Sequence, residues 1–175
     1  DTAYAFQGGT VKSLDSIIDE VLSFSPRYVT VTGGEPLAQP ECRELMTRLC
    51  DNGLEVSLET SGALTIENID ERVSIVMDLK TPSSDESHRN RYDNIPLLRQ
   101  HDQVKFVIGT EADYQWARFK LDEYCLTERV DEILFSPSFH QLTPTQLADW
   151  IVRDRLPVRM QLQLHKLLWK DEPGR

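Results

Sequence analysis

Short apolar runs rich in β-branched residues recur along the chain and predict six β-strands. The runs span residues 28–32, 54–60, 73–79, 104–108, 133–135 and 158–164, and their composition and length are typical of strands. The first run, YVTVT, leads directly into Gly33 and Gly34. This junction indicates a strand that ends in a turn.

Apolar residues at helical spacing separate several of these runs. One stripe follows Ser13, a candidate N-cap, and consists of Leu14, Ile17, Ile18, Val21 and Leu22. A second stripe precedes Gly53 and consists of Cys42, Leu45, Met46 and Leu49. Two more helices are expected to begin after Thr110 and Thr143, because Asp113 and Gln146 follow at the spacing of a capping box. Strands that alternate with helices indicate an α/β fold with a mostly parallel sheet.

The segment 81–100 lacks a clear apolar period, is polar and contains two prolines, so we expect either a long functional loop or a short helix followed by a loop. No internal repeat and no second domain are visible, and residues 1–175 are expected to form a single domain. Six strands of this kind can form either a partial TIM-type barrel or an open, doubly wound sheet. The apolar pattern alone does not distinguish the two.

Composition excludes several classes of protein. The chain has 19 Lys and Arg against 29 Asp and Glu, a formal net charge of −10, which argues against nucleic acid or a membrane surface as partner. No apolar run approaches the roughly 18 residues of a membrane span, and the first residues lack a signal-peptide pattern. The spacing of Cys42, Cys50 and Cys125 fits neither a disulfide scaffold nor a zinc ribbon. We therefore expect a cytoplasmic protein, and we expect a processed or cut N-terminus because the chain begins with Asp1.

Polar and glycine-rich residues follow five of the predicted strands. In parallel α/β folds ligands bind at this edge, because the loops there converge. The most specific cluster is GGEP. Gly33 and Gly34 allow a ligand to approach the backbone closely, and the Glu35 carboxylate suits an ammonium group. A plain turn would also use these residues. The five clusters are Thr32 to Pro36, Glu59 to Gly62, Asp78 with Lys80, Ser136 to Ser138, and His165 with Lys166.

GGEP after a strand resembles the S-adenosylmethionine (SAM) motif of radical SAM enzymes. The ordered set VTVTGGEPLAQP, LETSGAL, MDLKTP, NRYDNIPLL, QVKFVIG, LFSPS and QLQLHKLLW resembles the 7-carboxy-7-deazaguanine synthase family over nearly the whole chain. The resemblance implies a partial TIM-type barrel, a homodimer and a lyase of queuosine and 7-deazapurine biosynthesis, a tRNA modification pathway. The implied reaction converts 6-carboxy-5,6,7,8-tetrahydropterin into 7-carboxy-7-deazaguanine with loss of ammonia.

The resemblance also implies SAM, a [4Fe–4S] cluster and Mg²⁺ as cofactors, and an external electron donor. Substrate contacts are expected from Thr32, His165 and Arg175, and the hydroxyl of Thr2 is the expected Mg²⁺ ligand. SAM contacts are expected from Gly33, Gly34, Glu35, Glu59, Ser61, Asp78, Lys80, Ser136, Pro137 and Ser138. Lys80 matches the family's Ser-Pro-Lys at this place, whereas Asp78 departs from it.

The chain departs from the family most clearly in its cysteines. A [4Fe–4S] cluster needs thiolates close together, and the family's CxxxCxxC motif is absent from the sequence. We expect Asp1 to follow the last cluster cysteine, so that the first barrel strand is missing and the truncated chain alone is inactive. Two alternatives are another radical SAM activating enzyme and a non-catalytic barrel fragment that binds SAM or a partner.

Overall fold

A computed structural model describes residues 9–169 and contains a six-stranded parallel sheet. The strands are β1 (Tyr28–Val31), β2 (Glu55–Thr60), β3 (Ser74–Asp78), β4 (Gln103–Ile108), β5 (Glu132–Pro137) and β6 (Arg159–Met160). They are hydrogen-bonded to one another in sequence order, from β1 to β6. A doubly wound sheet reverses its strand order at a switch point, and this sheet does not. The α/β fold is therefore the partial barrel.

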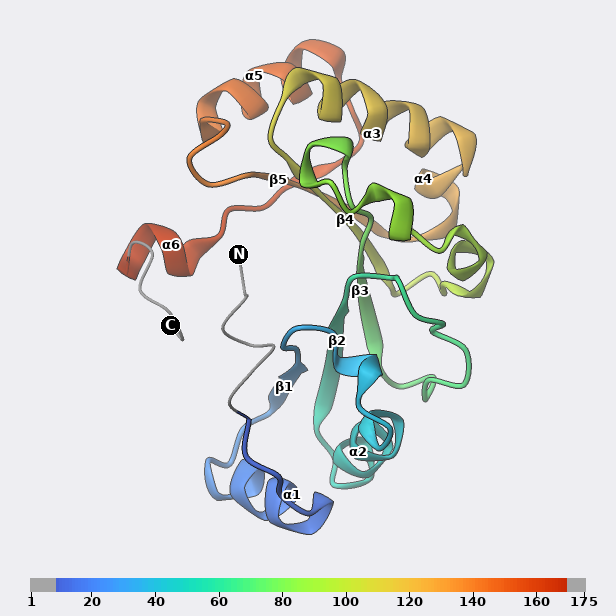
Figure 1. Cartoon of the computed structure of the whole chain (residues 1–175), viewed down its shortest axis with the longest axis vertical. Coiled ribbons are helices and arrows are strands. Elements are labelled where there is room, and N and C mark those ends of the chain that lie inside the picture. Colours follow the sequence, from blue (N-terminus) through green and yellow to red (C-terminus); the bar gives the residue numbers. More distant parts are fainter. Residues whose placement is uncertain (1–8, 170–175) are drawn as a thin grey trace.

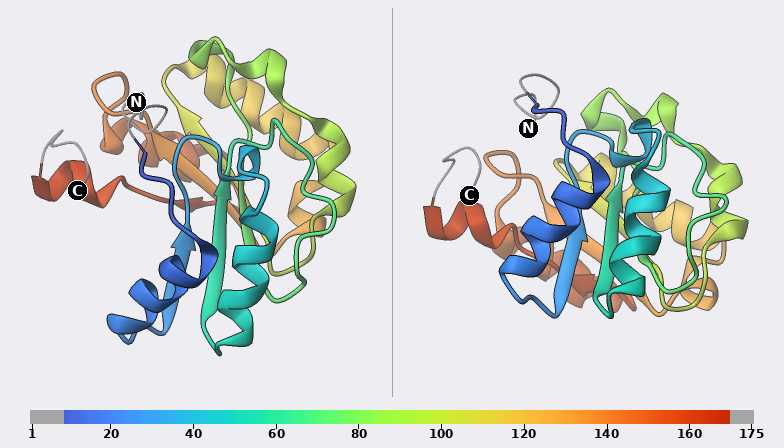
Figure 2. Two further views of the ribbon diagram at one scale, coloured as in Figure 1. Left: turned by 60° about the horizontal axis from the view of Figure 1, so that its bottom comes forward. Right: turned by 90° about the horizontal axis from the view of Figure 1, so that it is seen from below.

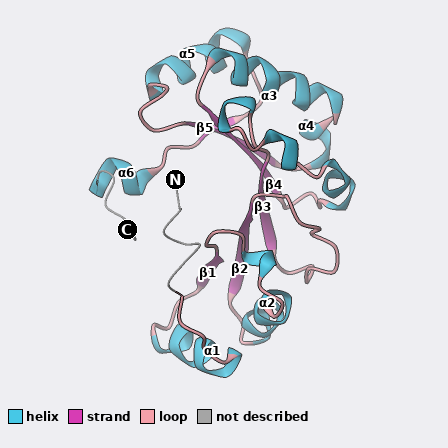
Figure 3. Cartoon of the chain, viewed as in Figure 1, coloured by secondary structure: helices cyan, strands magenta, loops and turns pink. Residues whose placement is uncertain are grey.

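The helices lie mainly on the outer side of a curved sheet (Figures 1 and 3). Figure 1 shows the sheet curving from β1 to β5 around an open concave side, and Figure 2 shows the first two helices beside β1 and β2. Among residues 9–169, no helix layer covers the concave face of the sheet. The helices are α1 (Leu14–Ser23), α2 (Cys42–Asp51), α3 (Glu111–Glu123), α4 (Leu126–Arg129), α5 (Pro144–Asp154) and α6 (Leu164–Trp169).

Local capping explains where three of the helices begin. The side chains of Ser13, Thr110 and Thr143 each accept a hydrogen bond from the backbone N–H three residues later. Thr110 and Asp113 form a complete capping box at the start of α3. Gly53 follows α2 with a φ of 78°, the left-handed conformation that commonly ends a helix. The predicted starts of α1, α3 and α5 are thus confirmed.

The core fills the space between the sheet and its helices. Along β4, Val104, Phe106 and Ile108 are buried in this core, whereas Lys105 lies between them in the alternating pattern. Phe106 packs edge-to-face on Phe135 of β5, with ring centroids 5.5 Å apart. Because successive strand residues point to opposite faces, the open side of the sheet receives the polar positions.

One sequence prediction needs correction. The predicted strand 158–164 extends over Arg159–Met160 only, and α6 begins at Leu164, so His165 lies in a helix and not at a strand end. The segment 81–100 agrees with the second of its two predicted forms, because loops in it alternate with the short 3₁₀ helices η3 (Pro82–Ser84), η4 (Ser87–Arg89) and η5 (Tyr92–Leu97). Another 3₁₀ turn, η2 (Pro36–Ala38), directly follows the GGE sequence.

Among the described residues, no helix has both the length and the apolar content that a membrane crossing would require.

Candidate cofactor site at the strand ends

Charged side chains gather on the open face of the sheet, near the ends of β2 and β3 and beside them on β4. Glu59, Asp78 and Lys105 each lie between two buried strand neighbours, so they project to the side opposite the helices. Lys80, just beyond β3, donates from Nζ to Asp78 Oδ2 at 2.7 Å. Lys105 Nζ lies 3.7 Å from Glu59 Oε2, which is an ion pair but longer than a hydrogen bond. The face therefore combines two carboxylates with two ammonium groups.

One carboxylate oxygen of Asp78 bonds to Lys80, but the other lacks a hydrogen-bond partner among the described residues. Asp78 Oδ1 is buried and has no hydrogen-bond partner within residues 9–169. The Asp78 side chain is only 16% exposed, and Lys105 is only 17% exposed. Buried polar groups normally have hydrogen-bond partners. A ligand with hydroxyl groups and a carboxylate would complete the bonding of both side chains.

The GGEP turn is fixed to the end of β2 through Glu35. Its carboxylate accepts hydrogen bonds from Thr60 Oγ1 at 2.8 Å, from the Ser61 N–H at 2.9 Å and from the Leu37 N–H at 3.1 Å. Ser61 Oγ is a further donor to the same carboxylate. Gly33 has a φ of 144°, a conformation that side-chain-bearing residues rarely adopt. These contacts hold the glycines at the edge of the sheet.

Other predicted SAM contacts lie at the same edge on the far side of the barrel. Ser136 and Pro137 are the last two residues of β5 and are buried. The Ser138 N–H donates to the Ile108 carbonyl at 2.8 Å, which keeps the chain beside β4 after β5 has ended. Thr32, predicted to contact the substrate, directly follows β1 and is exposed.

Three other predictions fall in places that the structure does not test. His165 lies in α6, and its side chain is not described. Thr2 and Arg175 lie outside residues 9–169. Their roles as substrate and Mg²⁺ contacts stay predictions.

Sequence reasoning missed Lys105. A signal was present, because the lysine interrupts the apolar run QVKFVI at an alternate position. In a half-buried strand this position faces away from Val104 and Phe106. The partnership with Glu59 could not be predicted in the same way, because it joins two strands that flank β3.

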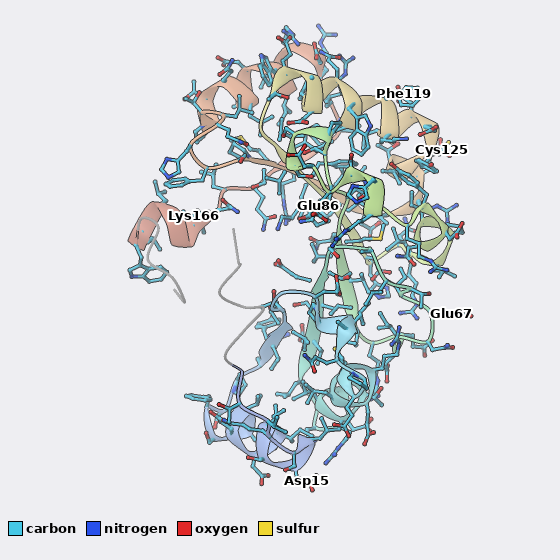
Figure 4. The ribbon with its side chains drawn as sticks, in the orientation of Figure 1. Asp15, Glu67, Glu86, Phe119, Cys125 and Lys166 are labelled. Atoms are coloured by element: carbon cyan, nitrogen blue, oxygen red, sulfur yellow. The ribbon has the colours of Figure 1, made fainter. Side chains whose placement is uncertain are left out.

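The described cysteines do not form a cluster site. Cys42 and Cys50 are buried in α2, and burial raises the pKa of both thiols. Cys125 is exposed, and Figure 4 shows it near the junction of α3 and α4 on the outer side. Within residues 9–169, no group of three or more His, Cys, Asp or Glu side chains is arranged to hold a metal ion. These residues therefore do not fit a [4Fe–4S] cluster.

The fold of the chain is similar to that of solved structures of Streptococcus suis SuiB. The crystal structure of Streptococcus suis SuiB bound to S-adenosylmethionine matches 90% of the chain with a TM-score of 0.63 and 13% sequence identity. The chain spans 43% of the SuiB chain. SuiB bound to its precursor peptide SuiA matches with a TM-score of 0.61 and 11% identity.

Curated relatives define the family. The 7-carboxy-7-deazaguanine synthase of Chlorobaculum tepidum is 43% identical over 175 residues, which cover 98% of this chain and 79% of the relative. The synthase of Koribacter versatilis is 38% identical and covers 98% of this chain and 82% of the relative. No protein-family model matches the chain. The chain belongs to the 7-carboxy-7-deazaguanine synthase family, radical SAM lyases of 7-deazapurine biosynthesis.

Proposed function

We propose that this protein converts 6-carboxy-5,6,7,8-tetrahydropterin into 7-carboxy-7-deazaguanine with loss of ammonia, using the open edge of its barrel to bind SAM and substrate. The observation that carries the proposal is the charged cluster of Glu59, Asp78, Lys80 and Lys105 at this edge in a chain of this family. In radical SAM enzymes, SAM bound to a reduced [4Fe–4S] cluster supplies the radical that abstracts hydrogen from the substrate. The cluster ligands have to come from outside residues 9–169.

The side chains at the edge fit the chemical groups of SAM. Asp78 Oδ1 is a buried acceptor without a partner among the described residues, which suits a ribose hydroxyl. Lys80 and Lys105 offer ammonium groups for a carboxylate, and Glu59, 44% exposed, offers a carboxylate for the amino group. Together they complement a zwitterionic amino acid joined to a nucleoside.

The remaining family contacts complete the proposal. The backbone of Gly33 and Gly34 would bind the methionyl part of SAM, while Glu35 and Ser61 fix that turn through their own hydrogen bond. Ser136, Pro137 and Ser138 would flank the adenine. The substrate would contact Thr32, His165 and Arg175, and Mg²⁺ would bind the Thr2 hydroxyl. We further propose a homodimer that receives its electron from an external donor.

The test uses the protein as encoded, including any residues that precede Asp1, reconstituted anaerobically with iron and sulfide. SAM affinity is measured by equilibrium binding, and 7-carboxy-7-deazaguanine is detected by mass spectrometry after addition of SAM, reductant, Mg²⁺ and the pterin. Lys80→Met should weaken SAM binding by about tenfold, the scale of a lost charged hydrogen bond. Lys12→Met is the matched control, because Lys12 pairs with Glu20 at the surface.

Each outcome decides one part of the proposal. Reconstituted protein that cleaves SAM but leaves the pterin unchanged would refute the substrate. Equal SAM affinity in the wild type and in Lys80→Met would refute the assignment of Lys80. Full turnover after removal of Mg²⁺ by a chelator would refute the metal requirement.

A further inference from the structure

The segment 81–100 holds the backbone of Lys80 through the side chain of Asn90. The Asn90 side chain accepts a hydrogen bond from the Lys80 N–H at 2.9 Å and donates one to the Lys80 carbonyl at 2.8 Å. Both backbone groups of one residue are therefore bonded to a single amide side chain. This amide lies ten residues along the chain from the residue that it holds.

The Asn90 amide takes the place of a neighbouring strand, because it bonds to the Lys80 backbone groups that such a strand would pair with. Beyond β3, the Leu79 N–H donates to the Lys105 carbonyl on the β4 side at 2.9 Å. Backbone groups of successive strand residues point alternately to the two sides, so those of Lys80 face the β2 side. Strand β2 has already ended at Thr60, whose register partner is Met77. Asn90 supplies the missing donor and acceptor.

Fixing the Lys80 backbone also restricts its side chain. Lys80 Nζ donates to Asp78 Oδ2 at 2.7 Å, and the Lys80 side chain is 33% exposed. A lysine side chain is long and flexible, so it loses much conformational entropy when a ligand fixes it. Because the Lys80 backbone is already held next to the site, the side chain has fewer conformations to lose. The entropy cost of ligand binding is therefore smaller.

The same segment anchors the exit of β2. The Arg91 N–H donates to the Gly62 carbonyl at 3.3 Å. Asn94, which is fully buried, donates from Nδ2 to the carbonyls of Gly62 at 3.0 Å and Leu64 at 2.8 Å. Residues 90–94 therefore connect the loops that follow two neighbouring strands.

We propose that Asn90 is a positioning residue for cofactor binding, which acts by holding Lys80 at the edge of the barrel. The inference rests on the proposed function, since it takes Lys80 as a SAM contact. It gives the segment 81–100 a defined role: the segment supplies the hydrogen bonds that the sheet lacks after β2 ends.

The test is a double-mutant cycle in the reconstituted protein as encoded, with the dissociation constant of SAM as readout. Asn90→Ala should weaken SAM binding by about tenfold, because the anchored lysine becomes free. In the Lys80→Met background, the same Asn90→Ala change should have an effect of less than about twofold, because its route to the cofactor is gone. Asn52→Ala is the matched control, since the Asn52 amide donates to the Arg48 carbonyl at the end of α2.

A second variant keeps the test decisive if Asn90→Ala fails to fold. Asn90→Asp retains the acceptor for the Lys80 N–H but places an oxygen against the Lys80 carbonyl, so it should also weaken SAM binding. Thermal unfolding of every variant separates loss of the fold from loss of binding.

Unchanged SAM affinity in folded Asn90→Ala, or additive losses in the cycle, would overturn the positioning role. A different experimental result would refute the proposed function. A wild-type protein that binds SAM but makes no 7-carboxy-7-deazaguanine refutes the reaction and leaves the cycle intact. Unchanged affinity in Lys80→Met refutes both the Lys80 contact and the positioning role.

Discussion

Replacing Glu35 by alanine should destabilise the fold, and not only the cofactor site. The change leaves Thr60 Oγ1 and the Ser61 N–H without their acceptor, and the Thr60 residue is only 3% exposed. A buried group that loses its hydrogen-bond partner costs about 1–3 kcal/mol. Because the groups share one carboxylate and can relax together, we expect a total loss of about 2–4 kcal/mol.

Urea unfolding followed by circular dichroism measures this loss. Glu35→Gln should lie between the wild type and Glu35→Ala, because it keeps one acceptor oxygen but places an amide near the donors of Ser61. The matched control is Glu41→Ala at the exposed N-cap of α2, where the side chain makes no capping hydrogen bond. Its effect should stay within about 0.5 kcal/mol. If Glu35→Ala lowers the free energy of unfolding by less than about 1 kcal/mol, the Glu35 carboxylate does not stabilise the fold. That result would favour a carboxylate that faces the amino group of the cofactor.

Two further predictions concern stability. Asp113 is buried, which by itself raises its pKa, but hydrogen bonds from Ser83, Thr110 and Gly109 together outweigh burial and lower the pKa below its usual range. Its stabilisation should be fully present above the unfolded pKa of about 3.9 and decline as the pH falls through the folded value. The loss in Asp113→Asn, about 2 kcal/mol at pH 7 in urea titrations, should therefore shrink at acidic pH, and a constant loss would contradict this. Gly62→Ala should cost about 1–2 kcal/mol more than Gly53→Ala in thermal unfolding. Both glycines have positive φ, but only at Gly62 would a Cβ meet Met77, at 2.8 Å, so equal losses would contradict the contact.

The sequence predicted the elements whose signals lie within a few residues. Ser13, Thr110 and Thr143 mark their helices because a cap bonds to the N–H three residues later, a contact that the local sequence contains. Short apolar runs rich in β-branched residues identified β2, β3 and β4 in the same way, and the structure shows alternating burial along all three. The same signal was wrong for most of 158–164, where only Arg159–Met160 pair with β5.

The sequence by itself determined the α/β elements, the GGEP turn at a strand end and, by resemblance, the family. The resemblance also implied the partial barrel, which the strand order confirms, whereas the partners of the site residues were decided by tertiary structure alone. Glu35 bonds to Thr60 25 residues later, and Lys105 pairs with Glu59 across β3. Such contacts depend on how the strands align in space, which no local pattern of apolar and polar residues specifies.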